Sequence, residues 1–175
     1  MKTLIKNLFS FFQRLIDRKK KKYYKRIVCR RAMSVGSVTV NGKSIVNSKT
    51  ILGNNVYLNG MTIEGWGKVT IGDNFRSGRG CIMMTSYHNY DAGEFIPYDN
   101  TYVHKDIMIG DNVWLGMNVT ILGGVTIGEG AIIQIGSVVV SDIPQLAIAG
   151  GHPAKVYKYR NKEHYYKLRS EGKLY

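Results

Sequence analysis

The sequence is poor in cysteine and proline, and it has no long run of apolar residues. Its two cysteines, Cys29 and Cys81, are far apart and fit no metal-ligand spacing. We therefore interpret both as reduced, structural thiols, as expected of a cytoplasmic protein. Three prolines and twenty glycines fit a chain built from long strands and many tight corners. A length of 175 residues predicts one compact domain with an added N-terminal element.

Acidic residues are scarce at the N-terminus. Residues 1–31 hold twelve Lys or Arg and one acid, Asp17, so this segment carries +11 of the net charge of +13. The rest of the chain carries only +2, and the high isoelectric point therefore describes the N-terminus rather than the domain. Because no known recognition fold accompanies the charge, we expect no nucleic-acid partner.

Apolar residues recur at helical spacing within the same segment, and a basic stretch follows them. They are Leu4, Ile5, Leu8, Phe9, Phe12, Leu15 and Ile16. This pattern predicts a basic amphipathic helix within residues 1–33. Polar residues interrupt it too often for a transmembrane span, and it has no clean apolar region or cleavage site of a secretory signal. Two interpretations stay open. Residues 1–31 adsorb to an anionic membrane at its inner face, or their apolar side packs on the domain or on a neighbouring subunit.

The sequence is rich in one feature, a period of six residues. Branched aliphatic residues recur without a break at Ile109, Leu115, Ile121, Ile127, Ile133 and Val139. Mostly small or β-branched residues follow four positions later in each hexad. A period of six suits neither an amphipathic helix nor an alternating strand, and it is typical of a solenoid in which a short strand and a tight corner repeat. Glycine and asparagine are expected at the corners, where φ can be positive.

The repeat is looser upstream and is absent between residues 85 and 105. Leu52–Val56 and Ile71–Phe75 resemble Ile109–Val113, whereas Gly65-Trp66-Gly67 predicts a bulge or small insertion. Segment 85–105 is polar and aromatic, and a long loop that leaves a regular solenoid is usually functional. We predict a β-helix domain over 34–156 with a protruding loop over 85–105. A C-terminal tail, 157–175, is expected to contain a short helix.

Several runs in the second half of the chain resemble the hexapeptide-repeat acyltransferases. They are Ile109-Gly-Asp-Asn-Val-Trp114-Leu-Gly, Val119–Gly128, Gly136-Ser137-Val-Val and Pro153-Ala-Lys155-Val. The likeness is to sugar O-acetyltransferases of the galactoside and maltose acetyltransferase kind and to their relatives in surface-polysaccharide synthesis. It covers residues 50–160 and leaves out residues 1–33. The resemblance implies an all-β fold, a left-handed parallel β-helix. It also implies a homotrimer with active sites between subunits, acetyl-CoA as donor, no metal, and a sugar or glycan acceptor.

Acetyl transfer to a sugar hydroxyl needs a base that takes the hydroxyl proton, and the pKa of histidine suits this task. The four histidines are His88, His104, His152 and His164. His88 lies in the loop ahead of the Ile109 turn, where the family resembled carries its catalytic histidine, and we assign it as the base. Asp91, three residues further on, is the candidate acid that orients the ring, with Glu64 and Glu94 as alternatives.

The remaining candidate residues bind the acceptor or the donor. We assign Asn59, Glu64, Asn89 and Trp114 to the acceptor. The resemblance implies that CoA lies along the edge of the C-terminal turns and that basic residues after the last turn meet its phosphates. The residues at these positions are Trp114, Gly116, Met117, Gly136, Ser137, Val140, Lys155, Lys158 and Arg160. Two departures from the family pattern, Gln134-Ile135 and Val140-Ser141, fall at the predicted donor site.

Rival functions use the same scaffold. An N-acetyltransferase acting on an amino sugar would share the donor and the base, and a β-helix without catalysis is the non-enzyme alternative. A serine O-acetyltransferase is disfavoured, because that family carries a dedicated N-terminal domain far longer than residues 1–33. A zinc carbonic anhydrase needs three histidines around the metal, and the close pair is missing here. We therefore predict direct transfer from acetyl-CoA to a sugar hydroxyl, with His88 as base, in surface-polysaccharide or glycan synthesis.

Overall fold

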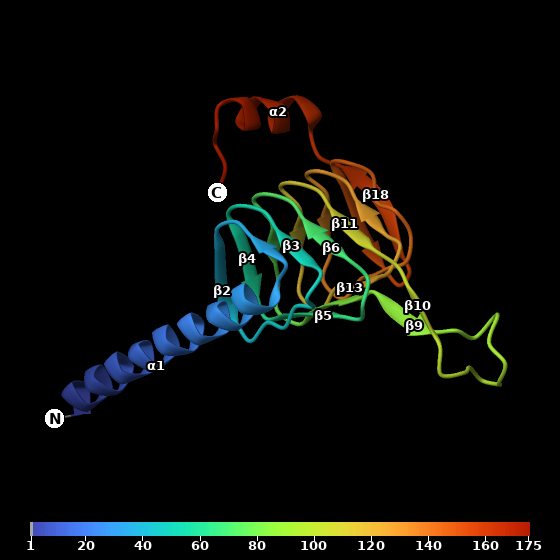
Figure 1. Cartoon of the computed structure of the whole chain (residues 1–175). Helices are drawn as coiled ribbons and strands as arrows, with labels where there is room; N and C mark the ends of the chain where they lie inside the picture. Colours follow the sequence, from blue (N-terminus) through green and yellow to red (C-terminus); the bar gives the residue numbers. More distant parts are fainter. Residues whose placement is uncertain (1) are drawn as a thin grey trace.

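The computed structural model describes residues 2–175, with side chains from residue 6 onward, as a parallel β-solenoid of about six turns with a helix at each end (Figure 1). The N-terminal helix α1 spans Lys2–Arg31, and the C-terminal helix α2 spans Lys162–Ser170. The β-solenoid and both helices that the sequence predicted are confirmed. The side chains of Leu4 and Ile5, assigned above to the apolar side of the helix, lie outside the described residues.

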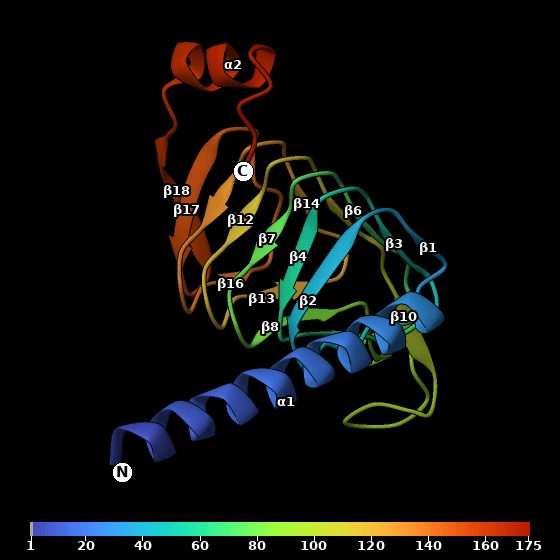
Figure 2. The same cartoon turned by 90° about the vertical axis from the view of Figure 1, so that its left-hand side faces the viewer.

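Three sheets run along the solenoid, and we call them faces A, B and C (Figure 2). Face A contains β1 (Ser34–Val35), β3 (Thr50–Leu52), β6 (Val69–Ile71), β11 (Ile107–Ile109) and β14 (Thr126–Ile127). Face B contains β2 (Val38–Gly42), β4 (Val56–Asn59), β7 (Arg76–Ser77), β12 (Trp114–Leu115), β15 (Ile132–Ile133), β17 (Ala147–Gly151) and the antiparallel β18 (Ala154–Tyr159). Face C contains β5 (Met61–Glu64), β8 (Cys81–Met84), β13 (Thr120–Leu122) and β16 (Val138–Val139).

The aliphatic residues of the six-residue period form the interior of the solenoid. Each of them, from Ile109 to Val139, is at most 3% exposed, and the residues four positions later, from Val113 to Ile143, are buried to the same degree. Their equivalents in earlier turns, including Leu52, belong to the same apolar cluster. Full burial of one such side chain stabilises the fold by about 1.5–3 kcal/mol. The core is therefore one continuous column built from neighbouring turns.

Glycine follows the inward aliphatic residue where successive turns come closest. A Cβ added to Gly110 would lie 2.7 Å from the backbone nitrogen of Glu129 in the next turn, which leaves no room for a side chain. Asparagine occupies corners with positive φ, as the sequence predicted: φ is 55° at Asn55, 56° at Asn74 and 59° at Asn112. The Asn55 amide donates a hydrogen bond of 2.8 Å to Oδ1 of Asn74, so these corners also link one turn to the next.

The Gly65–Gly67 stretch is the small insertion that the sequence predicted. Six positions separate Ile63 from Val69 across this corner, whereas four separate Ile121 from Val125 in a regular turn. The corner lies at the edge between faces C and A, where the chain passes from β5 to β6. The solenoid thus absorbs two additional residues without a change of core register.

The protruding loop leaves the solenoid at this same edge, after β8, and returns at β11. Within it, β9 (Ser86–His88) and β10 (Tyr102–His104) pair antiparallel, with His88 opposite Tyr102. We call residues 85–105 the hairpin. It projects away from the turns (Figure 1). Because a solenoid with three faces has three edges, the edge that carries the hairpin is the one opposite face B.

Helix α1 meets the solenoid only through its C-terminal end. Val28 is fully buried against the core, and Tyr24 and Ala32 pack beside it. All side chains from residue 6 to residue 23 are exposed, so the apolar residues from Leu8 to Ile16 do not pack on the chain's own β-helix. This finding corrects the prediction that the apolar side packs on the chain's own domain, and packing on a neighbouring subunit stays a prediction. No helix among residues 2–175 is both long enough and apolar enough to cross a bilayer.

Helix α2 is attached to the solenoid by Tyr165, its only buried residue. The Tyr165 hydroxyl donates a hydrogen bond of 2.9 Å to Oε1 of Glu129, and Arg169 forms an ion pair of 3.1 Å with the same carboxylate. Asn161 caps the helix by accepting a hydrogen bond from the backbone N–H of His164. The helix therefore lies beside the edge between faces A and B, next to the last turns (Figure 2).

Candidate active site

His88 is half-buried at the end of β9 and is held by aromatic side chains of the hairpin. Its ring stacks on Tyr98 with 3.9 Å between ring centroids, and it is tilted against Tyr102 at 4.4 Å. Its Nδ1 atom is buried and has no hydrogen-bond partner among the described residues. Stacking thus fixes the plane of the ring, but nothing within the described chain fixes its tautomer.

None of the three acids considered for this task forms a hydrogen bond with the buried Nδ1 atom of His88. Asp91 and Glu94 are exposed on the tip of the hairpin. Glu64 ends β5 with an exposed side chain, and its backbone oxygen accepts hydrogen bonds from the N–H and the hydroxyl of Thr85. That Asp91 orients the His88 ring therefore stays a prediction.

Asp99, which the sequence did not single out, organises the tip of the hairpin. Its carboxylate accepts hydrogen bonds from the hydroxyl and the N–H of Thr101 and from the N–H of Glu94, and those from Thr101 contribute most to holding the pKa of Asp99 below its ordinary value. An open hollow of about 520 Å³ lies beside it. The residues that line the hollow are His88, Phe95, Tyr98, Asp99, Asn100 and Tyr102. The tyrosine-rich composition of the loop was the only signal for this hollow in the sequence.

The two candidate asparagines have amide groups that are engaged within the chain. Asn89 donates to the Thr101 hydroxyl at 3.2 Å and accepts from the N–H of Ala92, so it shapes the hairpin. Asn59 donates to the backbone oxygen of Ser77 at 2.6 Å and accepts from Asn41 at 2.9 Å. It ends a strand of face B, so the structure does not bring it together with His88.

His104 lies at the base of the hairpin rather than beside His88. Its Nδ1 atom is 2.7 Å from the hydroxyl of Ser86, and that hydroxyl also accepts a hydrogen bond of 2.8 Å from the backbone N–H of Trp66. This contact links the inserted corner to the first hairpin strand. The exposed position of His104 makes it a natural comparison for His88.

A groove of about 520 Å³ lies on face B, on the opposite side of the solenoid from the hairpin edge. Three of the predicted donor residues, Trp114, Gly116 and Met117, line it. The other apolar side chains in its wall include Ile132, Ile135, Ile148 and Tyr157. Ile135 is 63% exposed there, so the departure from the family pattern falls directly on the wall of the groove. An elongated ligand with an apolar body fits such a surface.

The other predicted donor residues are more dispersed. Gly136, at the edge between faces B and C, has a φ of +70°, and Ser137 is buried with its hydroxyl donating to the backbone oxygen of Gln134 at 2.7 Å. Val140 follows β16 at the hairpin edge, away from the groove. Lys155 and Lys158 are exposed on β18. The structure therefore does not gather all of these residues around one cavity of the single chain.

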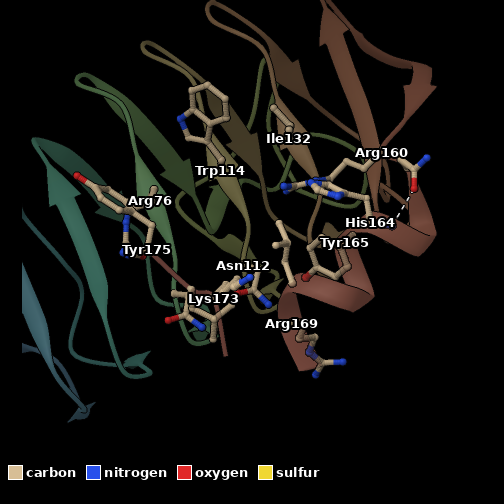
Figure 3. Close-up of a pocket in the computed structure, with 14 residues that line it drawn as sticks. Arg76, Asn112, Trp114, Ile132, Arg160, His164, Tyr165, Arg169, Lys173 and Tyr175 are labelled. Atoms are coloured by element: carbon tan, nitrogen blue, oxygen red, sulfur yellow. Dashed lines mark hydrogen bonds between the residues drawn. The ribbon is translucent and has the colours of Figure 1, made fainter. Parts of the chain in front are cut away.

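A basic pocket of about 450 Å³ adjoins the groove beneath α2 (Figure 3). The two cavities share Trp114 and Ile132 in their walls. The cationic and imidazole side chains that line the basic pocket are Arg76, Arg160, His164, Arg169 and Lys173. The arrangement suits a phosphate or another anion. Of these five, the sequence had indicated only Arg160 as a donor residue, because the others are brought together by the way α2 lies across the turns.

Arg76 is the most constrained cation of the basic pocket. Its guanidinium lies 4.0 Å from the ring centroid of Tyr57, and it donates hydrogen bonds to the backbone oxygens of Asn55 and Tyr175. The pKa of Arg76 is lowered from its ordinary value, because desolvation by burial outweighs the opposite effect of the neighbouring Tyr57 and Tyr175. Arg160 donates to the backbone oxygen of Gly130 at 3.2 Å, so both side chains are fixed at the rim.

The repeat region matches a family of known proteins. Residues 106–141 match the model of the bacterial transferase hexapeptide (six repeats). The chain is 35% identical to the galactoside O-acetyltransferase of Escherichia coli over 120 residues, which are 66% of this chain and 58% of that enzyme. The chain spans about half the length of that enzyme and of similar curated relatives.

Solved structures of similar proteins share the fold. A galactoside acetyltransferase in complex with coenzyme A has a TM-score of 0.71 and 29% identity, covering 81% of this chain and 72% of that one. A maltose O-acetyltransferase from Clostridium difficile has a TM-score of 0.64 and 24% identity, covering 84% and 89% of the two chains. The second likeness concerns the fold alone.

Proposed function

From the premise that this chain is a hexapeptide-repeat protein resembling the galactoside and maltose O-acetyltransferases, we propose that it transfers the acetyl group of acetyl-CoA to a hydroxyl of a sugar or glycan. One observation carries the proposal: a histidine held by stacked aromatic rings on a hairpin that projects from a rigid solenoid. A base in this setting has a fixed ring plane and an open hollow beside it for an acceptor.

The groove on face B and the basic pocket together suit the donor. CoA combines a long, weakly polar pantetheine arm with phosphates, and the two adjoining cavities offer an apolar wall followed by cations. Arg76 and Arg160 are fixed by contacts within the chain, which lowers the entropy lost when they bind a phosphate. The solved galactoside acetyltransferase with a similar fold is a complex with coenzyme A, which supports this assignment.

In the proposed reaction His88 acts as the general base. A ring nitrogen of His88 takes the proton of an acceptor hydroxyl. At the same time, the oxygen of that hydroxyl forms a bond to the carbonyl carbon of the thioester. The carbon–sulfur bond then breaks, and the proton passes from His88 to the departing thiolate, so CoA leaves as the free thiol. No acetylated enzyme is needed, because a thioester is already activated.

We further propose that the protein works as a homotrimer with each active site between two chains. The hairpin leaves the edge opposite face B, so one chain does not bring its own His88 to its own groove. A neighbouring copy supplies the groove in this arrangement, and it also offers a partner for the unsatisfied Nδ1 atom of His88. A buried polar atom without a partner costs about 1–3 kcal/mol, which favours such completion.

The acceptor that we propose is a saccharide of surface-polysaccharide or glycan synthesis. Phe95, Tyr98 and Tyr102 line the hollow beside His88, and aromatic rings with a polar edge suit the alternating apolar and hydroxylated faces of a sugar. An extended saccharide fits this setting because the hollow is open to solvent along the hairpin.

The test is an assay of transfer from labelled acetyl-CoA to mono-, oligo- and lipid-linked saccharides, each compared with its amino-sugar counterpart. His88→Ala should lower turnover by about 10²–10⁴-fold, the usual loss when a general base is removed. His104→Ala, in the same hairpin but away from the hollow, is the matched control and should stay within a few-fold of wild type. Near-wild-type turnover of His88→Ala would remove His88 from the mechanism. Transfer to amino sugars alone would replace O-acetylation by N-acetylation.

A further inference from the structure

Helix α1 carries an exposed apolar surface that the chain itself leaves uncovered. Phe9 is 71% exposed, Leu8 57% and Phe12 54%, and Leu15 and Ile16 are exposed as well. With a rotation of about 100° per residue, these side chains fall on one side of the helix, within an arc of about 120°. The arc is as wide as the apolar face of helices that bind another surface.

This apolar arc points away from the solenoid. The residues through which α1 packs on the core, Tyr24, Val28 and Ala32, are spaced four apart and lie on the side of the helix opposite the arc. Helix α1 projects as a straight rod beyond the first turn (Figures 1 and 2). The solenoid of the same chain is therefore behind the helix, and the apolar arc faces outward.

Cations continue the same outward side toward the C-terminal end of α1. Lys19, Arg26 and Arg30 fall on the arc that Leu8 to Ile16 define, and Lys22 lies just beyond its edge; the four cations follow Ile16 by about one to four turns. Around them, residues 1–31 carry twelve cations and a single acid. The outward side of α1 thus consists of an apolar half followed by a cationic half.

We propose that α1 docks on an anionic lipid surface. The apolar side chains from Leu8 to Ile16 enter the boundary between headgroups and acyl chains, to a depth of about 5–10 Å. Lys19, Lys22, Arg26 and Arg30 lie on the headgroups, where each cation contributes about 1 kcal/mol. A second copy of α1 fits this surface less well, because two such helices would bring their rows of cations together. The docking depends on neither His88 nor the groove of face B.

Vesicle sedimentation with full-length chains tests the proposal. One variant, Phe9→Gln with Phe12→Gln and Ile16→Gln, removes apolar area, and a second, Lys19→Gln with Lys22→Gln and Arg26→Gln, removes three outward cations. The matched control removes three exposed cations of the solenoid, Lys43→Gln with Lys49→Gln and Lys68→Gln. All of these side chains are exposed, so unchanged thermal unfolding is the expected check that each variant folds.

At low salt, wild type and control should bind vesicles of phosphatidylcholine with phosphatidylglycerol far more strongly than vesicles of phosphatidylcholine alone. The cation variant should bind on the order of a hundredfold more weakly, since three cations are lost from the surface. The apolar variant should lose the binding that persists at high salt. Equal binding by all variants, or no binding by wild type, would overturn the proposal. If wild type instead forms larger oligomers and binds no vesicles, and only the apolar variant fails to form these oligomers, α1 serves self-association.

Discussion

The regular turns over residues 107–139 and the hairpin over 85–105 differ in how completely one chain satisfies its own groups. In the turns, the inward aliphatic residues are at most 3% exposed, and corner groups are bonded to the next turn, as when Asp111 accepts from the N–H of Asp73 at 2.8 Å. In the hairpin, Ile96 is fully exposed, Phe95 is 70% exposed, and Nδ1 of His88 is buried without a partner. The turns are thus complete as a scaffold, whereas the hairpin presents exposed apolar side chains and an unpaired polar atom that the single chain does not satisfy.

Removing the tip of the hairpin should separate the two regions most sharply. Replacing residues 89–101 by Asn-Gly keeps β9 and β10 and joins them by a two-residue turn. Acetyl transfer should fall by about 10² or more, because Tyr98 and the hollow beside His88 are lost. The free energy of unfolding should change by less than about 1 kcal/mol, since the tip buries no apolar side chain. Full activity in this variant would exclude the hollow from the site.

The same substitution made in each region should have unequal effects on stability. Ile121→Ala should lower the free energy of unfolding by about 2–5 kcal/mol, because Ile121 is fully buried and its truncation leaves a cavity. Ile96→Ala should change it by less than about 0.5 kcal/mol. Denaturant unfolding of both variants measures the difference. Equal losses would show that the hairpin is packed as firmly as the turns in solution.

Helix α2 should be held on the solenoid less firmly than the turns are held on one another, because Tyr165 is its only buried residue. The stability of this docking should depend on pH. Burial, followed by the hydrogen bond and the charge of Glu129, raises the pKa of Tyr165 to about 12 from its ordinary value of 10.0. Because the phenol of the undocked helix loses its proton first, docking is stable below pH 10 and weakens as the pH rises from 10 to 12. Tyr165→Phe should remove this pH dependence and should cost about 0.5–1.5 kcal/mol at neutral pH.

Tyrosinate absorbance and helix content, followed across the same pH range, measure this effect. A wild-type helix that is as stable at pH 12 as at pH 9 would contradict the assignment. Glu129→Gln is the useful companion variant, because it keeps an acceptor for the Tyr165 hydroxyl while it removes the negative charge. The pKa of Tyr165 in the docked helix should be raised less in this variant, so the loss of docking should begin at the same pH as in wild type but should end at a lower pH and be smaller.

The scaffold could be predicted from the sequence because a β-solenoid repeats one local rule. Every turn needs an inward aliphatic residue, a small residue where its backbone lies against the next turn, and a residue with positive φ at the corner. Ile109, Gly110 and Asn112 meet these three needs, and each can be recognised from its own position in the repeat. The hairpin was found by the same logic, as the place where the rule fails.

The site was predicted less completely, because its contacts join distant parts of the chain. Asp91 is close to His88 in the sequence, yet no hydrogen bond joins them, and Asp99 instead organises the tip of the hairpin. Asn59 was assigned to the acceptor, but its amide bonds Ser77 and Asn41. Arg76 was missed because its place in the basic pocket depends on the C-terminal segment, in which its hydrogen-bond partner Tyr175 is 99 residues further along the chain.

The opposite placement of the hairpin and face B has a consequence for symmetry. A contact between one copy's hairpin and another copy's groove joins two different surfaces, so it is heterologous: each copy gives its hairpin to one neighbour and receives a hairpin from the other. Such contacts close into a ring when the rotation between neighbours divides a full turn evenly, and they grow into filaments when it does not. In the proposed ring every active site takes His88 from one chain and the groove from its neighbour. Chains that lack His88 and chains with a blocked groove, each inactive alone, should therefore regain activity when they are assembled together.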